Sequence, residues 1–242
     1  MVDSPAPAPA ERDLDRAAAA GRGADLLARF VWRRPAAALA GEAERAGLVP
    51  VQLLLIAIVL GAAPFFLWRS GWYWTGIAAA LAFLLAETVA GEAARSSGGG
   101  IPRWASVIDQ GVGVVYPPLW WWAWAAGLAV VDRPLEQVFE LMIVGAILFG
   151  HVALRVIERI FERRYAMPLR RWKRIDERFH LICAARQPDL AILTLSLLLG
   201  RPDVGIELVA LWTLLSLTFQ AVRLAMANDR RAHGRPVVSW RT

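Results

Sequence analysis

The sequence predicts an all-α fold, a polytopic membrane protein with six transmembrane helices and an N-terminal amphipathic interfacial helix. Three observations predict it. Of the 242 residues, 57% are hydrophobic and twelve are Trp, a composition typical of a small membrane protein rather than a soluble enzyme. Apolar runs of about 20 residues, the helix length that crosses a bilayer core, recur along the chain. Arginines gather in alternate connections, as in cytoplasmic loops.

The N-terminal region divides into two parts. Residues 1–24 lack a basic start that leads into an apolar core, so we expect a disordered tail rather than a signal peptide. Apolar and basic side chains then recur at helical spacing within residues 25–46, namely Leu26, Leu27, Phe30 and Val31 beside Arg29, Arg33 and Arg34. This pattern predicts a helix on the membrane surface, and a solvated basic helix is the alternative.

Five apolar runs are long enough to span a bilayer, namely residues 50–68, 71–90, 107–131, 136–157 and 204–226. A sixth segment, 189–200, is short for a span. Arginines crowd the N-terminus, two of the loops and the C-terminal tail, which places both termini in the cytoplasm and requires an even number of crossings. We therefore expect the short segment to cross, extended through 181–187, which gives a six-helix domain over 47–228 and a cytoplasmic tail over 229–242.

The third expected span contains the run YPPLWWWAWAAGL. Pro117 and Pro118 predict a kink, because proline removes a backbone donor and its ring clashes with the preceding turn. The tryptophans that follow, Trp120, Trp121, Trp122 and Trp124, are expected to pack the bundle and anchor it at the interface. Stacking on a ligand is the alternative role for these rings.

A polar pattern stands at the junction of the second and third spans. It reads E-x-x-A-G-x-x-A-R, then nine residues, then A-x-x-x-D-x-x-x-G, over residues 87–113. Helical spacing places Glu87 and Gly91 on one face of the second span, and Asp109 and Gly113 on one face of the third. The small residues allow the two helices to approach closely.

This pattern resembles the signature of the CDP-alcohol phosphatidyltransferases, D-x-x-D-G-x-x-A-R, eight or nine residues, then G-x-x-x-D-x-x-x-D. The resemblance implies a six-helix membrane enzyme of phospholipid headgroup transfer, which moves a substituted phosphoryl group from a CDP-linked donor to an alcohol. It also implies Mg²⁺ or Mn²⁺ as cofactor, a CDP-linked lipid or CDP-alcohol as partner, and a homodimer. The first span starts with GLVPVQL, which is similar to the same family.

By this resemblance, Glu87 and Asp109 hold the metal ion, and Gly91, Arg95 and Arg103 bind the cofactor-linked phosphates. Two acids of the family pattern are absent, because Ala and Gly stand at positions 90 and 113. Loss of a general base typically lowers a rate by about 10²- to 10⁴-fold, so no catalytic residue is assigned and turnover is in doubt. Glu92 is a candidate substitute, but helical geometry turns it away from the vacated position.

Three functions stay open from the sequence. The chain is an active transferase of this type, a catalytically silent lipid-binding or partner subunit of the same fold, or a small carrier or scaffold that matches by chance. The plain interpretation of the motif is a set of boundary charges, Glu87 and Glu92, beside a glycine turn. The GGG loop at 98–100 is a further candidate for approach to phosphates, because glycine tolerates close backbone contact.

Two further polar regions are candidates for function. The basic loop 163–186 predicts an interfacial helix on anionic phospholipids, with a pocket for an acidic headgroup as the sharper alternative. Glu140, His151 and Arg155 lie within the fourth span, where ionisable groups are costly and often functional. The aromatic residues belong to apolar spans, so we expect no nucleic acid partner. The expected location is a bacterial inner membrane.

Overall fold

The fold of the chain is known from a computed structural model that describes residues 32–97 and 101–240. Every regular element in that part is helical. The helices are α2 (Arg33–Arg45), α3 (Pro50–Arg69), α4 (Tyr73–Ser96), α5 (Arg103–Gly127), α6 (Gln137–Tyr165), α7 (Arg174–Ile182), α8 (Arg186–Leu198) and α9 (Pro202–Ala232), with short 3₁₀ turns η2 (Leu128–Val131) and η3 (Leu169–Arg171). The tail expected at 1–24, the first part of the 25–46 helix and the GGG loop lie outside the described residues.

Five of these helices are long and apolar enough to cross a membrane. They are α3, α4, α5 extended through η2, α6 and α9, which confirms the five long runs. The pair α7 and α8 adds a sixth crossing if it is counted as one span, and its two halves meet at an angle of 49°. The sequence thus located the membrane-embedded helices, whereas the bend before Arg186 was not expected.

The helix α2 covers the described part of the segment in which a surface helix was expected. It packs against α4 through Ala36 and Ala40, both buried. Ser96 at the end of α4 also donates a hydrogen bond to Glu44 of α2. The helix therefore lies along the bundle at the C-terminal end of α4.

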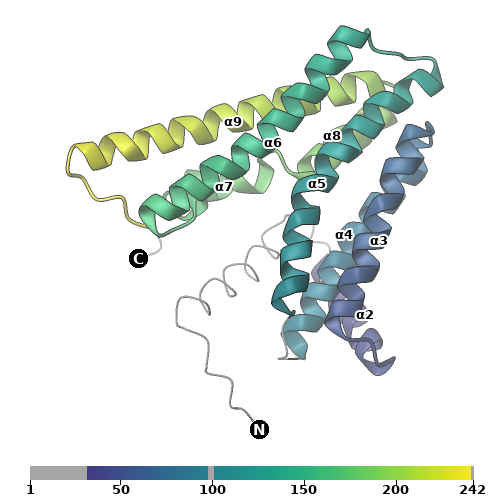
Figure 1. Cartoon of the computed structure of the whole chain (residues 1–242), viewed down its shortest axis with the longest axis horizontal. Coiled ribbons are helices and arrows are strands. Elements are labelled where there is room, and N and C mark those ends of the chain that lie inside the picture. Colours follow the sequence, from purple (N-terminus) through teal and green to yellow (C-terminus); the bar gives the residue numbers. More distant parts are fainter. Residues whose placement is uncertain (1–31, 98–100, 241–242) are drawn as a thin grey trace.

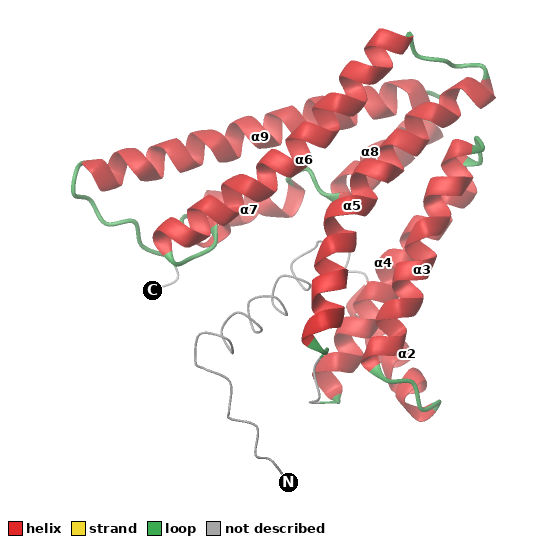
Figure 2. Ribbon diagram, in the orientation of Figure 1, coloured by secondary structure: helices red, strands yellow, loops and turns green. Residues whose placement is uncertain are grey.

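The spans separate into two arms (Figure 1; Figure 2). One arm contains α2, α3, α4 and the first half of α5, and the other contains α6, α7 and α9. The arms meet at the end where the short connections α3–α4, α5–α6 and α8–α9 lie, and they diverge towards their other ends. α5 changes direction along its length (Figure 1). Pro117 and Pro118 lie inside it, as expected for a proline kink.

The main apolar core joins the two arms where they meet. Trp120, Trp121 and Trp124 of α5 are buried there among residues of α3, α4, α6, α8 and α9. The indole N–H of Trp120 donates to the Gly61 carbonyl at 2.8 Å, and that of Trp124 donates to the Pro202 carbonyl at 3.0 Å. These contacts confirm the packing role of Trp120, Trp121 and Trp124, whereas Trp122 is 41% exposed.

The far end of each arm has a small apolar cluster of its own. In the first arm, residues of α2, α3, α4 and the start of α5 form one cluster. In the second, Phe161, Leu169, Trp172 and Ala227 form another. The two arms therefore share an apolar core only where they meet.

Candidate functional site

The motif residue Glu87 lies on α4 where the two arms begin to separate. Its Oε1 accepts a hydrogen bond from Nη1 of Arg186 at 2.9 Å, and both side chains are about one-fifth exposed, at 19% and 20%. The guanidinium of Arg186 also lies over the Phe83 ring, 5.2 Å from its centroid. The carboxylate expected to bind a metal ion is therefore neutralised by an arginine from α8.

Position 90, where the resembled family has its second acid, faces the apolar cluster at the far end of the first arm. Ala90 is 1% exposed and packs with Ala36 of α2, Leu54 of α3 and Ala105 of α5. A carboxylate there would lose its hydration without gaining a polar partner. The absence of an acid at this position therefore fits the packing of this chain.

The remaining motif residues sit near the ends of α4 and α5. Gly91 is buried, and a Cβ placed there would lie 3.9 Å from Nη1 of Arg95. Arg95 forms an ion pair with Glu92 at 2.6 Å. Asp109 is half-buried on α5, and Arg103 is the exposed first residue of that helix. Ala90 thus packs at a helix interface, whereas a Cβ at Gly91 would meet only Arg95 of its own helix. In the described part of the chain, α3 packs against both α4 and α5, and these two helices do not approach each other closely, so the expected close approach of the second and third spans is wrong.

The fit to Mg²⁺ or Mn²⁺ follows from these side chains. Among the described residues, no group of three or more His, Cys, Asp and Glu side chains is arranged to hold a metal ion. Hard cations require several oxygen ligands, and Glu87 is already paired with Arg186. The residues in the described part of the chain do not match a carboxylate cage, so no chemical step is assigned to a metal ion here.

The second arm contains a buried ion pair that the sequence did not single out. Nε and Nη2 of Arg223 donate to the two carboxylate oxygens of Asp176 at 2.5 and 2.7 Å. The guanidinium also lies 4.3 Å from the centroid of the Trp172 ring. Such a two-pronged contact is the strong form of an arginine–carboxylate pair, and here it ties α7 to α9.

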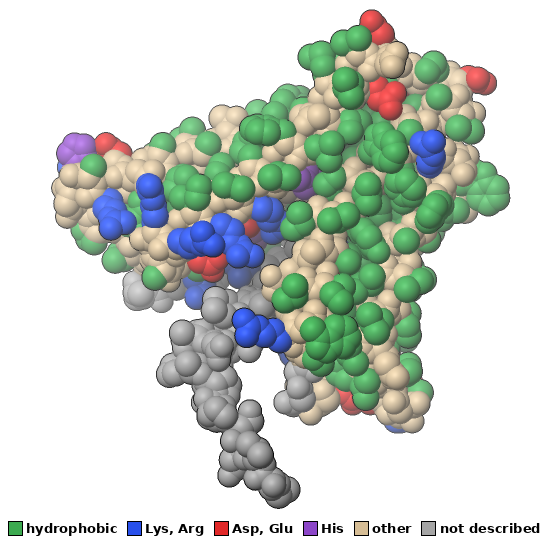
Figure 3. All heavy atoms as spheres, viewed as in Figure 1, with side chains coloured by type: hydrophobic (Ala, Val, Ile, Leu, Met, Phe, Trp, Pro, Cys, Tyr) green, Lys and Arg blue, Asp and Glu red, His purple; other side chains and the backbone are tan. Residues whose placement is uncertain are grey.

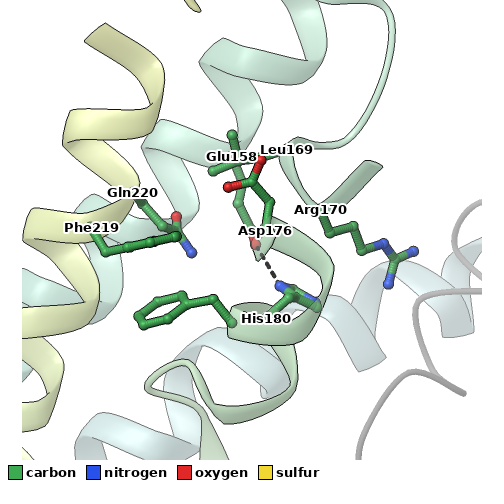
Figure 4. Close-up of a pocket in the computed structure, with 8 residues that line it drawn as sticks. Glu158, Leu169, Arg170, Asp176, His180, Phe219 and Gln220 are labelled. Carbon is green, nitrogen blue, oxygen red and sulfur yellow. Dashed lines mark ion pairs between the residues drawn. The ribbon is translucent and has the colours of Figure 1, made fainter. Parts of the chain in front are cut away.

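A small polar pocket lies beside this ion pair (Figure 4). It is lined by Glu158, Leu169, Arg170, Asp176, Phe179, His180, Phe219 and Gln220, and it has room for about one water molecule. Nδ1 of His180 lies 3.7 Å from Oε1 of Glu158. The pocket is too small for a lipid headgroup, so the sharper alternative for the basic loop, a headgroup pocket, finds no matching cavity at this place.

Two ionisable residues of the fourth expected span lie beside acids. His151 lies 3.4 Å from Asp189 of α8, and Arg155 lies 3.6 Å from Glu158 on its own helix. The sequence marked His151 as an intramembrane ionisable group, but it did not pair it with Asp189. The signal for Asp189 was an acid at the start of an apolar segment, which is a weak one because such acids are also common at helix N-termini.

Basic side chains gather towards the far end of the second arm, away from the shared core. Figure 3 shows Lys and Arg side chains over α6 and α7, on the side that faces the space between the arms, while the visible face of the first arm is largely hydrophobic. Along these elements, Arg159 and Arg163 lie on α6, Arg170 on η3, Lys173 just before α7, and Arg178 on α7.

Comparison of the chain with protein-family models, with curated proteins and with solved structures finds no match.

Proposed function

We propose that this chain is an integral membrane protein of the CDP-alcohol phosphatidyltransferase type that has lost headgroup transfer and binds an anionic, phosphate-bearing headgroup at the inner membrane surface. The Glu87–Arg186 ion pair carries this proposal. In the resembled family the first acid of the motif faces a divalent cation. Here the positive charge beside that acid belongs to a guanidinium of the protein itself.

Arginine suits a headgroup phosphate because its planar fork donates two parallel hydrogen bonds to a phosphate group. Arg186, Arg95 and Arg103 lie at the inner ends of α8, α4 and α5. Arg186 and Arg95 have acidic partners, at 2.9 Å and 2.6 Å. A phosphate group would therefore compete with a carboxylate for each guanidinium, which predicts binding that weakens as ionic strength rises.

The packing of position 90 supports a silent site rather than an altered active one. Ala90 belongs to an apolar cluster shared with α2 and α3, so an acid supplied from a neighbouring chain could not reach that point. The proposed partners are CDP-linked lipids or CDP-alcohols together with anionic phospholipids. We place the inner ends of both arms, and both termini, on the cytoplasmic side, and a homodimer is the proposed assembly.

The experiment uses the full chain in lipid nanodiscs with CDP-diacylglycerol as the probe. We expect binding that persists when Mg²⁺ and Mn²⁺ are chelated, and no CMP release above the protein-free rate with either ion and an acceptor alcohol. Release of CMP that depends on the ion and on Glu87 would identify an active transferase instead. No binding of CDP-diacylglycerol or of anionic lipid would mean that the motif matches by chance.

A pair of matched variants locates the binding. Arg186→Gln removes the guanidinium beside Glu87, and we expect it to weaken CDP-diacylglycerol binding by about tenfold, the loss of one charge-assisted hydrogen bond. Arg133→Gln removes the same charge at the opposite end of the spans, where Arg133 lies 3.3 Å from Asp203. Equal effects of the two substitutions would contradict a site at the inner end of α4.

A further inference from the structure

Two ionisable side chains in the middle of the bundle belong to neither the motif nor the proposed headgroup site. His151 lies midway along α6 (Gln137–Tyr165), and Asp189 lies on α8. His151 Nε2 is 3.4 Å from Asp189 Oδ2, with the imidazole 13% exposed and the carboxyl group fully buried. Ionisable groups at such a depth are costly, so they pair with one another or serve a function.

The hydrogen bonds of the imidazole determine what it can offer to Asp189. Nδ1 of His151 lies 3.0 Å from the carbonyl oxygen of Ile147. A carbonyl oxygen only accepts, so Nδ1 carries a proton. Nε2 then faces the carboxyl group either as a second N–H donor or as a lone pair that accepts a proton from Asp189. Each arrangement has one proton between the two atoms. Without it, two lone pairs would face each other inside the bundle.

Among the groups around Asp189, the proton shared with His151 is the main one that offsets the cost of burying the carboxyl group. Four atoms are buried here and lack a hydrogen bond of good geometry in the described part of the chain: both oxygens of Asp189, Nε2 of His151 and the indole nitrogen of Trp121. His151 and Trp121 are the side chains placed to donate to the carboxyl group. Trp121 of α5 is a neighbour of the carboxyl group. The indole N–H can only donate, so it favours an acceptor oxygen on Asp189 and cannot receive the proton.

The other ionisable groups on the elements around the pair do not replace His151. Cys183, just before α8, is buried and lies within electrostatic reach of Asp189 and Glu158. Arg186, one turn before Asp189 on α8, is held by Glu87. The side chains of α9 at this level, Thr213 and Ser216, are neutral and bond to the Val209 carbonyl and the Ala184 N–H.

We propose that Asp189 and His151 form a proton-binding site inside the membrane, in which one proton is held between Oδ2 and Nε2 and exchanges with water through the partly exposed imidazole. With the proton the pair is neutral, and without it the pair has one negative charge. The only bond that forms or breaks is the O–H or N–H bond of that proton. The proposal is independent of the headgroup site.

The test is ¹⁵N magnetic resonance of the histidine rings in the full chain in nanodiscs. The sequence has three histidines, so His180→Gln with His233→Gln leaves His151 alone to be observed. We expect a protonated Nδ1, and an Nε2 signal of a nitrogen that shares a proton in a hydrogen bond. In Asp189→Asn, the Nε2 signal should move to the position of an unprotonated nitrogen, while Asp189→Glu should restore the shared-proton signal.

Two controls keep the outcome decisive. Trp121→Phe removes the neighbouring N–H and should leave Nε2 sharing its proton. Infrared spectra of the unsubstituted chain with isotope-labelled aspartate, compared in H₂O and D₂O, report on the buried carboxyl group if a variant fails to fold. An unprotonated Nδ1, or His151 signals that are the same in Asp189→Asn, would overturn the proposal. A change on adding a chelator would do so too, because a metal ion would then lie between the groups.

Discussion

The two polar regions of this molecule differ in how their charges are held. In the last turn of α4, Arg95 pairs with Glu92 three residues before it, and the Arg95 side chain is 45% exposed. In the second arm, Arg223 pairs with Asp176, 47 residues away in the chain, and the two side chains are 8% and 1% exposed. The first pair is a local contact in water. The second joins two elements and excludes water.

This difference shows where the structure depends on a charge and where it tolerates one. A local surface pair contributes little, because water screens it and the two side chains lose conformational entropy when they form it. A buried pair is costly to break, because removal of one partner leaves the other as an uncompensated charge. The exposed Arg95–Glu92 pair of the motif thus contributes little to stability, whereas the buried pair on which stability depends more strongly lies in the other arm.

The largest effect is expected from the buried pair. Arg223→Leu should lower the free energy of unfolding by about 3–5 kcal/mol, because the Asp176 carboxylate stays buried without its partner. The measurement is denaturant unfolding in mixed micelles. The double variant Asp176→Leu with Arg223→Leu should recover most of the loss, since apolar replacements of a buried pair are often neutral. A loss in the double variant as large as in the single one would mean that side-chain packing, not charge, dominates here.

The next effect tests the motif itself. Ala90→Asp should lower the free energy of unfolding by about 3 kcal/mol, because the acid enters an apolar cluster within a span. Gly113→Asp is the matched change, since a Cβ at position 113 meets no atom within 4 Å. We expect it to cost less than Ala90→Asp, because no neighbouring atom has to move to admit the new side chain. Equal costs in thermal unfolding would contradict the different packing of the two positions.

A smaller effect is expected where the two arms begin to separate. Glu87→Gln should cost about 1 kcal/mol, because the pair with Arg186 is only partly buried and water screens it. Unfolding of both proteins at low and high salt provides the check. The difference between them should shrink as salt rises. A cost that salt leaves unchanged would indicate that the hydrogen bond, rather than the charge, stabilises this contact.

The smallest effect is expected at the end of α4. Arg95→Gln removes an exposed i,i+3 pair and should change the free energy of unfolding by at most about 0.5 kcal/mol. This variant is also the surface control for Arg223→Leu in the same unfolding assay. A cost near that of Arg223→Leu would erase the distinction between the two regions.

The long spans were predictable from the sequence because a helix in a membrane needs a continuous apolar run. The five long runs are all helical in the structure. Residue type alone predicted the kink at the α5 proline pair and the packing role of the buried tryptophans. The segment 189–200 was harder. Its crossing was inferred from charge, whereas the structure shows a short helix that joins α7 at a 49° bend, and apolar length gives no sign of such a bend.

The candidate site was predictable only in part. Helical spacing placed Glu87 with Gly91 on one face of α4, but it could not reveal that Arg186, 99 residues away, would pair with that acid. Nor could it reveal that Ala90 packs against α2 and α3. Spacing determines neighbours along one helix, whereas neighbours across helices depend on how the arms pack.

By itself, the sequence determined that this chain is an all-helical membrane protein. It also determined which stretches form the long apolar helices and where the positive charge lies along the chain. Those properties follow from hydrophobicity and charge, which each residue has on its own. Only the tertiary structure decided which acid meets which base: Glu87 with Arg186, Asp176 with Arg223, and Asp189 with His151. Pairing between distant segments depends on the geometry of helix packing. The interaction energy between two charges becomes large only when that packing has excluded water from around them.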